Sequence, residues 1–281
     1  MSDEVATAQP FLRRALAAVA IVDLLSFPNF LANARANALA DGIAPGLFAD
    51  LVSRPAPRWA IALVGAGAAL AFARRPGRLG AGLAALAALM LFSTAHTELF
   101  GSPWRHLFFS GVCLSGWLLG LAASRWRAEP EDESFARTGS VALLGAAYLN
   151  AGISKLAFSG LDWMSGAPIQ AIIVAQEGLV GGGVLGAYRQ WVVSAPTLAA
   201  FFSIATVLFE LAGPLLLAGP RLRALVALGL LGMHLNIFLL TNILYWEALV
   251  MLILFGLWPA AAEARAAPRA ASRRWIAAAA L

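Results

Sequence analysis

Apolar residues recur along this sequence in eight long stretches, separated by polar or basic segments. Most of these stretches come close to the roughly 20 residues that a helix needs to cross the hydrocarbon core of a bilayer. The pattern predicts an all-α fold, a polytopic transmembrane helix bundle of about eight spans that fills residues 1–281 as a single domain. The predicted spans are 11–27, 58–73, 79–97, 104–123, 139–158, 197–218, 221–240 and 246–259.

Composition identifies lipid as the solvent for most of this chain. Hydrophobic residues make up 60% of the sequence and charged residues only 12%. A soluble globular domain has roughly 45–50% and about 25%. A soluble protein with a large core is therefore excluded, and the predicted partner is the lipid bilayer.

Basic residues show which ends of the predicted spans share a side of the membrane. With eight spans, the arginines at the start of the first span and after the second, fourth, sixth and last spans all fall on one side. The positive-inside rule makes that side cytoplasmic. We therefore expect a multi-pass inner or plasma membrane protein with both termini in the cytoplasm. The net charge of +5 does not predict a nucleic-acid partner, because the basic residues are not clustered with interleaved aromatic residues.

Two outer segments, 28–57 and 159–196, are too long to be simple turns. Long outer loops over a helical bundle often cap a site, and we expect these two to cap this bundle. The first reads as an interfacial or partly helical lid, and the second holds a short apolar piece and a run of three glycines. Unstructured connectors are the alternative for both.

Lys155 is the single lysine among the 20 basic residues, and it lies within a predicted span. A charge is costly there, and burial can deprotonate a lysine but not an arginine. A general base is one interpretation. The other is a lysine whose long side chain reaches the outer interface, since Lys155 is close to the end of its span.

Further polar residues are predicted to gather at the same level of the bundle, in the outer half of the bilayer. Tyr148, Gly152 and Lys155 share one helix face, although Gly152 can equally serve ordinary helix packing. Glu210 lies near mid-membrane, ahead of a kink predicted at Gly213 and Pro214. The remaining candidates are His96, His106, His234, Asn150 and Asn236.

Metal binding is a minor alternative for the three histidines. The sequence has no His-x-x-His or Glu-x-x-His pair, and a lone histidine such as His96 is often only a packing residue. No metal site is therefore predicted.

Several of these residues form a motif. The segment YLNAGISKL (148–156) followed by Trp163, the Phe209-Glu210 pair with Pro214, and His234 before an apolar stretch resemble the HTTM family. This family comprises the transmembrane domain of vitamin K-dependent gamma-carboxylase and its bacterial relatives. The resemblance covers most of the chain and is strongest from Val141 to Leu254.

The resemblance implies a chemistry. It makes Lys155 the base that deprotonates vitamin K hydroquinone or another quinol, with His106 and His234 as catalytic partners. Tyr148, Asn150, Gly152, Trp163, Glu210, His96 and Asn236 are then expected to bind or support the substrate.

This sequence has no counterpart of the carboxylase's large lumenal region, so we expect another quinol-linked oxidation or a separately encoded protein partner. A similar Ala-Gly-x-x-Lys-Leu piece occurs in DoxX-type membrane proteins, which are shorter. The alternative function is a non-catalytic membrane partner that serves immunity, maturation or assembly. A transporter is less favoured, because the polar residues gather in one half of the bilayer.

Overall fold

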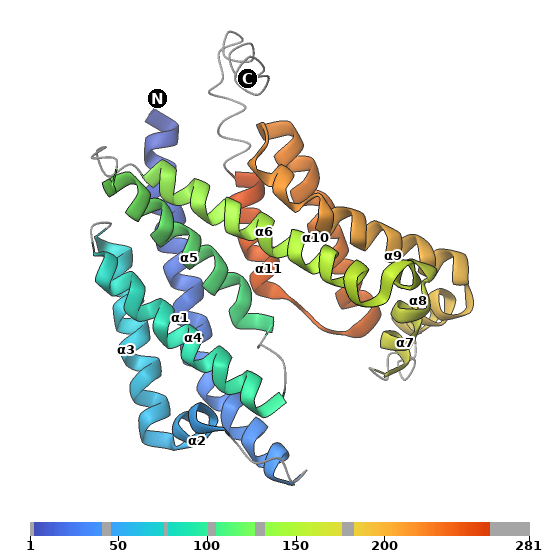
Figure 1. Ribbon diagram of the computed structural model, residues 1–281, viewed down its shortest axis with the longest axis horizontal. Coiled ribbons are helices and arrows are strands. Elements are labelled where there is room, and N and C mark those ends of the chain that lie inside the picture. Colours follow the sequence, from blue (N-terminus) through green and yellow to red (C-terminus); the bar gives the residue numbers. More distant parts are fainter. Residues whose placement is uncertain are drawn as a thin grey trace.

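The computed structural model is all-helical across its described residues, which are 3–40, 46–75, 78–100, 105–126, 133–175 and 183–258 (Figure 1). This confirms the predicted all-α fold, whereas the predicted count of about eight spans is not confirmed. The α-helices are α1 (Asp3–Ala40), α2 (Leu47–Ser53), α3 (Pro55–Arg74), α4 (Leu79–Phe100), α5 (Arg105–Trp126), α6 (Glu133–Ser159), α7 (Ala167–Ala175), α8 (Gly183–Ser194), α9 (Pro196–Leu211), α10 (Pro220–Thr241) and α11 (Trp246–Met251). Shorter elements are the 3-10 helices η1 (Gly160–Ser165) and η2 (Gly213–Leu217) and the π-helix η3 (Leu252–Leu257).

Several helices are long and apolar enough to cross a bilayer, which indicates a membrane protein. Four helical segments of the described chain meet this criterion: α3, α4, α6 together with η1, and α10. A fifth results if α8 and α9, which are bent by 93° relative to each other, form one span. The predicted spans 197–218 and 246–259 correspond to shorter helices. α9 has 16 residues and ends just before Gly213 and Pro214, where the kink was predicted.

The two segments predicted as outer loops are largely helical in their described parts. α1 continues past residue 27 to Ala40, although Pro28 lies inside it. Proline removes one backbone hydrogen bond from a helix. Because α1 packs along α3 and α4, this loss does not end the helix, whose stability comes mainly from packing. The second segment contains η1, α7 and α8, and α2 lies within the first.

Contacts between distant residues define the two ends of the bundle. Arg13 near the start of α1 forms an ion pair with Glu133 at the start of α6 and donates to the Ala73 carbonyl near the end of α3 (3.3 Å). Phe11 stacks on Trp258 at the end of the described chain, with ring centroids 5.1 Å apart. At the opposite end, the Ala49 amide of α2 donates to the Glu98 carboxylate of α4 (2.6 Å). These contacts fit helices that run alternately up and down.

Two apolar clusters form the core. The larger one joins α1, α3, α4, α5, α6, α10 and α11, and the smaller one joins α7, α8, α9 and α10. α6 reaches from one group of helices to the other (Figure 1). It lies tightly against α5, because a Cβ on Gly116 or Gly139 would overlap the backbone of the facing helix. Small residues allow this kind of close packing in membrane helices.

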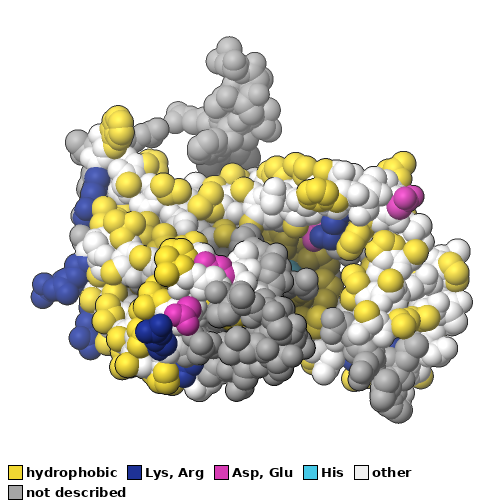
Figure 2. All heavy atoms as spheres, turned by 60° about the horizontal axis from the view of Figure 1, so that its bottom comes forward, with side chains coloured by type: hydrophobic (Ala, Val, Ile, Leu, Met, Phe, Trp, Pro, Cys, Tyr) yellow, Lys and Arg dark blue, Asp and Glu magenta, His cyan; other side chains and the backbone are white. Residues whose placement is uncertain are grey.

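The outside of the molecule carries many large apolar side chains. Val64, Leu119 and Phe201 are among those exposed, and Figure 2 shows hydrophobic side chains spread over much of one face. Lipid is the solvent that suits such a surface. The same face is hollowed between two lobes, and hydrophobic side chains line the hollow (Figure 2).

Candidate functional site

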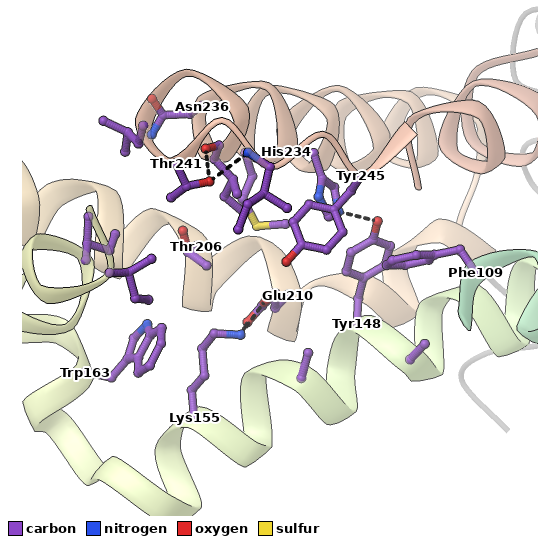
Figure 3. A pocket seen from close by; sticks show the side chains of 18 residues that line it. Phe109, Tyr148, Lys155, Trp163, Thr206, Glu210, His234, Asn236, Thr241 and Tyr245 are labelled. Carbon is purple, nitrogen blue, oxygen red and sulfur yellow. Dashed lines mark hydrogen bonds and ion pairs between the residues drawn. The ribbon is translucent and has the colours of Figure 1, made fainter. Parts of the chain in front are cut away.

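A pocket of about 500 Å³ lies between α6, η1, α7, α9 and α10 (Figure 3). Its wall is mainly apolar, with a small number of polar side chains. This is the usual make-up of a site for a small organic molecule. The lining residues labelled in Figure 3 are Phe109, Tyr148, Lys155, Trp163, Thr206, Glu210, His234, Asn236, Thr241 and Tyr245.

An ion pair between Lys155 and Glu210 crosses the pocket wall from α6 to α9. The Lys155 Nζ lies 2.7 Å from each oxygen of the Glu210 carboxylate. The Lys155 side chain is 21% exposed and that of Glu210 only 7%, so the lysine is the more accessible of the two lining residues. An ammonium group has three N–H donors. Glu210 uses two of those of Lys155, which leaves one.

Gly152 explains how these two side chains meet. It lies one turn before Lys155 on α6, and a Cβ there would stand only 3.1 Å from the side chain of Leu211 on α9. The glycine therefore lets α9 approach α6 next to the ion pair. The structure assigns Gly152 to helix packing, and it is not among the residues that line the pocket.

A second polar pair, Tyr148 and His234, links α6 to α10. The Tyr148 hydroxyl and the His234 Nε2 are 2.8 Å apart, and both residues are buried. Phe109 of α5 and Tyr245 pack against the His234 ring, with centroid distances of 5.8 and 5.4 Å. These contacts fix the orientation of the imidazole at the pocket wall.

The end of α10 explains why Tyr245 reaches the pocket. The Thr241 hydroxyl donates to the Ile237 carbonyl (2.7 Å) and accepts from the Ile243 amide (3.2 Å). Asn242 then adopts a left-handed backbone conformation with φ of 60°, which asparagine tolerates better than most residues. The chain therefore reverses at this point, and Tyr245 packs against His234.

Two polar atoms of the pocket residues lack a hydrogen-bond partner in the described structure. They are the Trp163 Nε1 and the His234 Nδ1, and both are buried. The Trp163 ring also lies 5.3 Å from the Lys155 Nζ, a cation–π contact. Polar groups of a bound molecule are suitable partners for these two atoms.

The predicted site residues divide into two groups. Those that the structure brings together around the pocket are Tyr148, Lys155, Trp163, Glu210, His234 and Asn236. Asn236 also accepts a hydrogen bond from the Tyr188 hydroxyl of α8 (2.6 Å). Asn150 is exposed on another face of α6. His106 belongs to α5, but its side chain lies outside the described residues.

His96 is not brought to this pocket. It is buried in α4, and its ring lies 5.8 Å from that of Phe30 and 6.5 Å from that of Phe27. Both phenylalanines belong to α1. The expectation that His96 gathers with Lys155 considered only its depth along the helix, and depth does not specify which neighbouring helix the side chain faces.

Other pocket residues were missed by the sequence analysis. Thr206 precedes Glu210 by one turn on α9, so the helical period could have identified it. Tyr245 could not be found in this way, because the segment between α10 and α11 is irregular. Among the described residues, no group of three or more His, Cys, Asp or Glu side chains is arranged to hold a metal ion.

Comparison with protein-family models, with curated proteins and with solved structures finds no match for this chain. The resemblance to the HTTM family rests on the sequence motifs and stays a prediction.

Proposed function

We propose that this chain is a quinol-binding membrane enzyme of the HTTM type, in which the Lys155 and Glu210 pair accepts a phenolic proton. The observation that carries this proposal is the ion pair at the wall of a mainly apolar pocket. A quinol has an apolar ring system and acidic hydroxyl groups. The pocket offers apolar walls for the ring and a proton-accepting pair for a hydroxyl.

The proton transfer takes place in two balanced steps. Lys155 first passes a proton to the Glu210 carboxylate, which leaves a neutral amine and a neutral acid. The amine then accepts the proton of the quinol hydroxyl, and the products are an ammonium and a phenolate. Exclusion of water by the apolar wall strengthens the attraction between these two charges. His234 and the Trp163 indole are placed to bond other polar groups of the quinol.

The proposed setting is an inner or plasma membrane, with about eight spans and both termini in the cytoplasm. Each of the eight predicted spans falls largely on helix in the described structure. Phe11 and Trp258, from opposite ends of the described chain, lie in contact. In this setting, a quinol reaches the pocket from the lipid. A separately encoded protein supplies the quinol or uses the product.

A non-catalytic membrane partner is the second candidate, and one observation favours it. Glu210 binds Lys155 through both oxygens, so the pair can serve to hold α6 against α9. In that case, replacement of the lysine by arginine would preserve function, because arginine also pairs well with a carboxylate.

The test is anaerobic binding of menadiol, a naphthoquinol, to the protein in lipid nanodiscs. We expect the absorption spectrum of the bound ligand to show the phenolate form with the native protein. Lys155→Arg should bind menadiol in its neutral form, because arginine cannot be deprotonated. Lys155→Met should weaken binding at least about tenfold, or roughly 1.4 kcal/mol.

Asn150→Ala is the matched control, since Asn150 is exposed on the same helix and should leave both readouts unchanged. If the native protein does not bind menadiol, quinol binding is wrong. If Lys155→Arg still yields the phenolate, Lys155 is not the base.

A further inference from the structure

Asp23, Ser110 and Glu247 form a second group of buried polar side chains, which the proposed reaction does not use. They belong to α1, α5 and α11, and their exposed fractions are 4%, 0% and 1%. None of the three was among the candidate residues of the sequence analysis. The fold brings them into contact.

Hydrogen bonds join the three side chains. The Asp23 carboxyl bonds with the Ser110 hydroxyl and with the Glu247 carboxyl. An ionised carboxylate has only acceptor atoms, so two ionised carboxylates cannot bond with each other. The contact between Asp23 and Glu247 therefore requires a proton on one of them. Two adjacent negative charges in a water-poor interior would also repel each other strongly.

A further atom is available to receive a proton at this group. The Asp23 Oδ2 is buried and lacks a hydrogen-bond partner among the described residues. A second proton placed there in the resting state would be a buried donor without an acceptor, which is unfavourable. The geometry thus favours one held proton and one acceptor atom that is not yet used.

Two members of the group are close in sequence to residues of the pocket wall. Ser110 follows Phe109 on α5, and Glu247 follows Tyr245 by two residues, and both of these aromatic residues line the pocket. Among the described residues, titratable side chains near these elements include His96, which contacts Phe27 one turn along α1 from Asp23, and His234, which contacts Tyr245.

We propose that Asp23 and Glu247 form a buried proton-binding site, which holds one proton between two carboxyl groups and exchanges it with its surroundings. The ligand of this site is the proton itself, carried by water or by a neighbouring acid. This proposal goes beyond the proposed function and does not depend on quinol binding.

Infrared spectroscopy of the full-length protein in nanodiscs at neutral pH tests the proposal. A protonated carboxyl group has a C=O stretching band that is separate from the carboxylate bands. We expect the double variant Asp23→Asn with Glu247→Gln to lose the intensity of one protonated carboxyl group per molecule. In the native protein, this band should shift after equilibration in D2O. Asp50→Asn is the control, because Asp50 is far more exposed and pairs with Arg54.

Two results would overturn the proposal. One is a loss of zero or of two protonated groups in the double variant, and the other is a band that does not move in D2O. If the double variant does not fold, carbon-13 labelling of the aspartate or glutamate carboxyls of the native protein gives the same information. The C=O band of the buried protonated carboxyl group should then shift with at least one of these labels. A band that shifts with neither would exclude Asp23 and Glu247 as the site of the proton.

Discussion

Burying Lys155 and Glu210 costs less free energy when they are paired than when each is alone in an apolar environment. Their 2.7 Å contacts and the closeness of the helices at Gly152 reduce that cost. The same pairing gives the lysine a local acceptor for its proton. Under the proposed function, Lys155 therefore both anchors α6 to α9 and transfers a proton.

Tyr148→Phe tests the second polar pair at the residue scale. The substitution removes the hydroxyl that bonds His234 and leaves a buried ring nitrogen without this partner. An unsatisfied buried polar group costs about 1–3 kcal/mol, so we expect the free energy of unfolding to fall by that amount in denaturant titrations in detergent.

Tyr188→Phe is the matched comparison for this prediction. The Tyr188 hydroxyl also donates a hydrogen bond, to Asn236, but Tyr188 is only half-buried. Water can replace the lost bond more easily there, and we expect a smaller loss. Equal stability of Tyr148→Phe and the native protein would show that the bond to His234 does not stabilise the fold.

Part of the candidate site was predictable from single residues, because each of them is unusual in its own stretch. Lys155 and Glu210 are charges within apolar stretches, and His234 is a lone histidine in another. Their partners were not predictable, since the contacts join residues 55 and 86 positions apart. Asp23 and Glu247 are just as unusual, and the common role proposed for them follows only from their contact, which joins α1 to α11.

Helix packing in this protein depends on positions where no side chain is allowed. α5 and α6 meet at Gly116 and Gly139, whose missing Cβ atoms let the two backbones touch. α6 carries Tyr148 and Lys155 further along its length. The position of the pocket residues therefore depends on a contact at the other end of the same helix.

Gly139→Leu should separate these two helices. Overpacking of a tight contact costs about 1–3 kcal/mol, and we expect a loss of this size in the free energy of unfolding. Gly67→Leu on α3 is the control, because nothing lies within 4 Å of a Cβ at Gly67. That variant should be neutral or slightly more stable, since leucine favours helix more than glycine does. A Gly139→Leu protein as stable as Gly67→Leu would contradict this account.

Elements were predictable where a long apolar stretch determines them. All eight predicted spans lie largely on helix, because hydrophobic length is a strong signal. Helix ends were less predictable: α1 passes through Pro28, and α9 gives way to a 3-10 helix. These ends depend on packing against other helices, which the local sequence does not contain.

The whole molecule has two ends, which the proposed topology places on opposite sides of a membrane. Arg54, between α2 and α3, and Arg125, near the end of α5, are both exposed. α2 contacts Glu98 near the end of α4, so Arg54 lies at that end of the bundle. α5 runs from there toward the start of α6, where Arg13 pairs with Glu133, so Arg125 lies at the opposite end. The native background for thiol labelling is low, because Cys113 is buried.

Cysteine labelling tests this topology. In sealed vesicles with the cytoplasmic face inside, an impermeant maleimide should label Arg54→Cys at once and Arg125→Cys only after the vesicles are opened. Labelling of the native protein, which has Cys113 alone, gives the background. If both variants react from the same side, the proposed arrangement of α3, α4 and α5 in the membrane is wrong.

The stacking of Phe11 on Trp258 has a consequence for biosynthesis. These two rings come from the first and last described helices, so their contact cannot form until nearly the whole chain has left the ribosome. Contacts of such long sequence separation form slowly, and α1 lacks this partner while the later helices are inserted. A chain stopped at the end of α10 would also lack Tyr245 and Glu247. Such a fragment would therefore expose part of α1 to cellular quality control and would have an incomplete pocket.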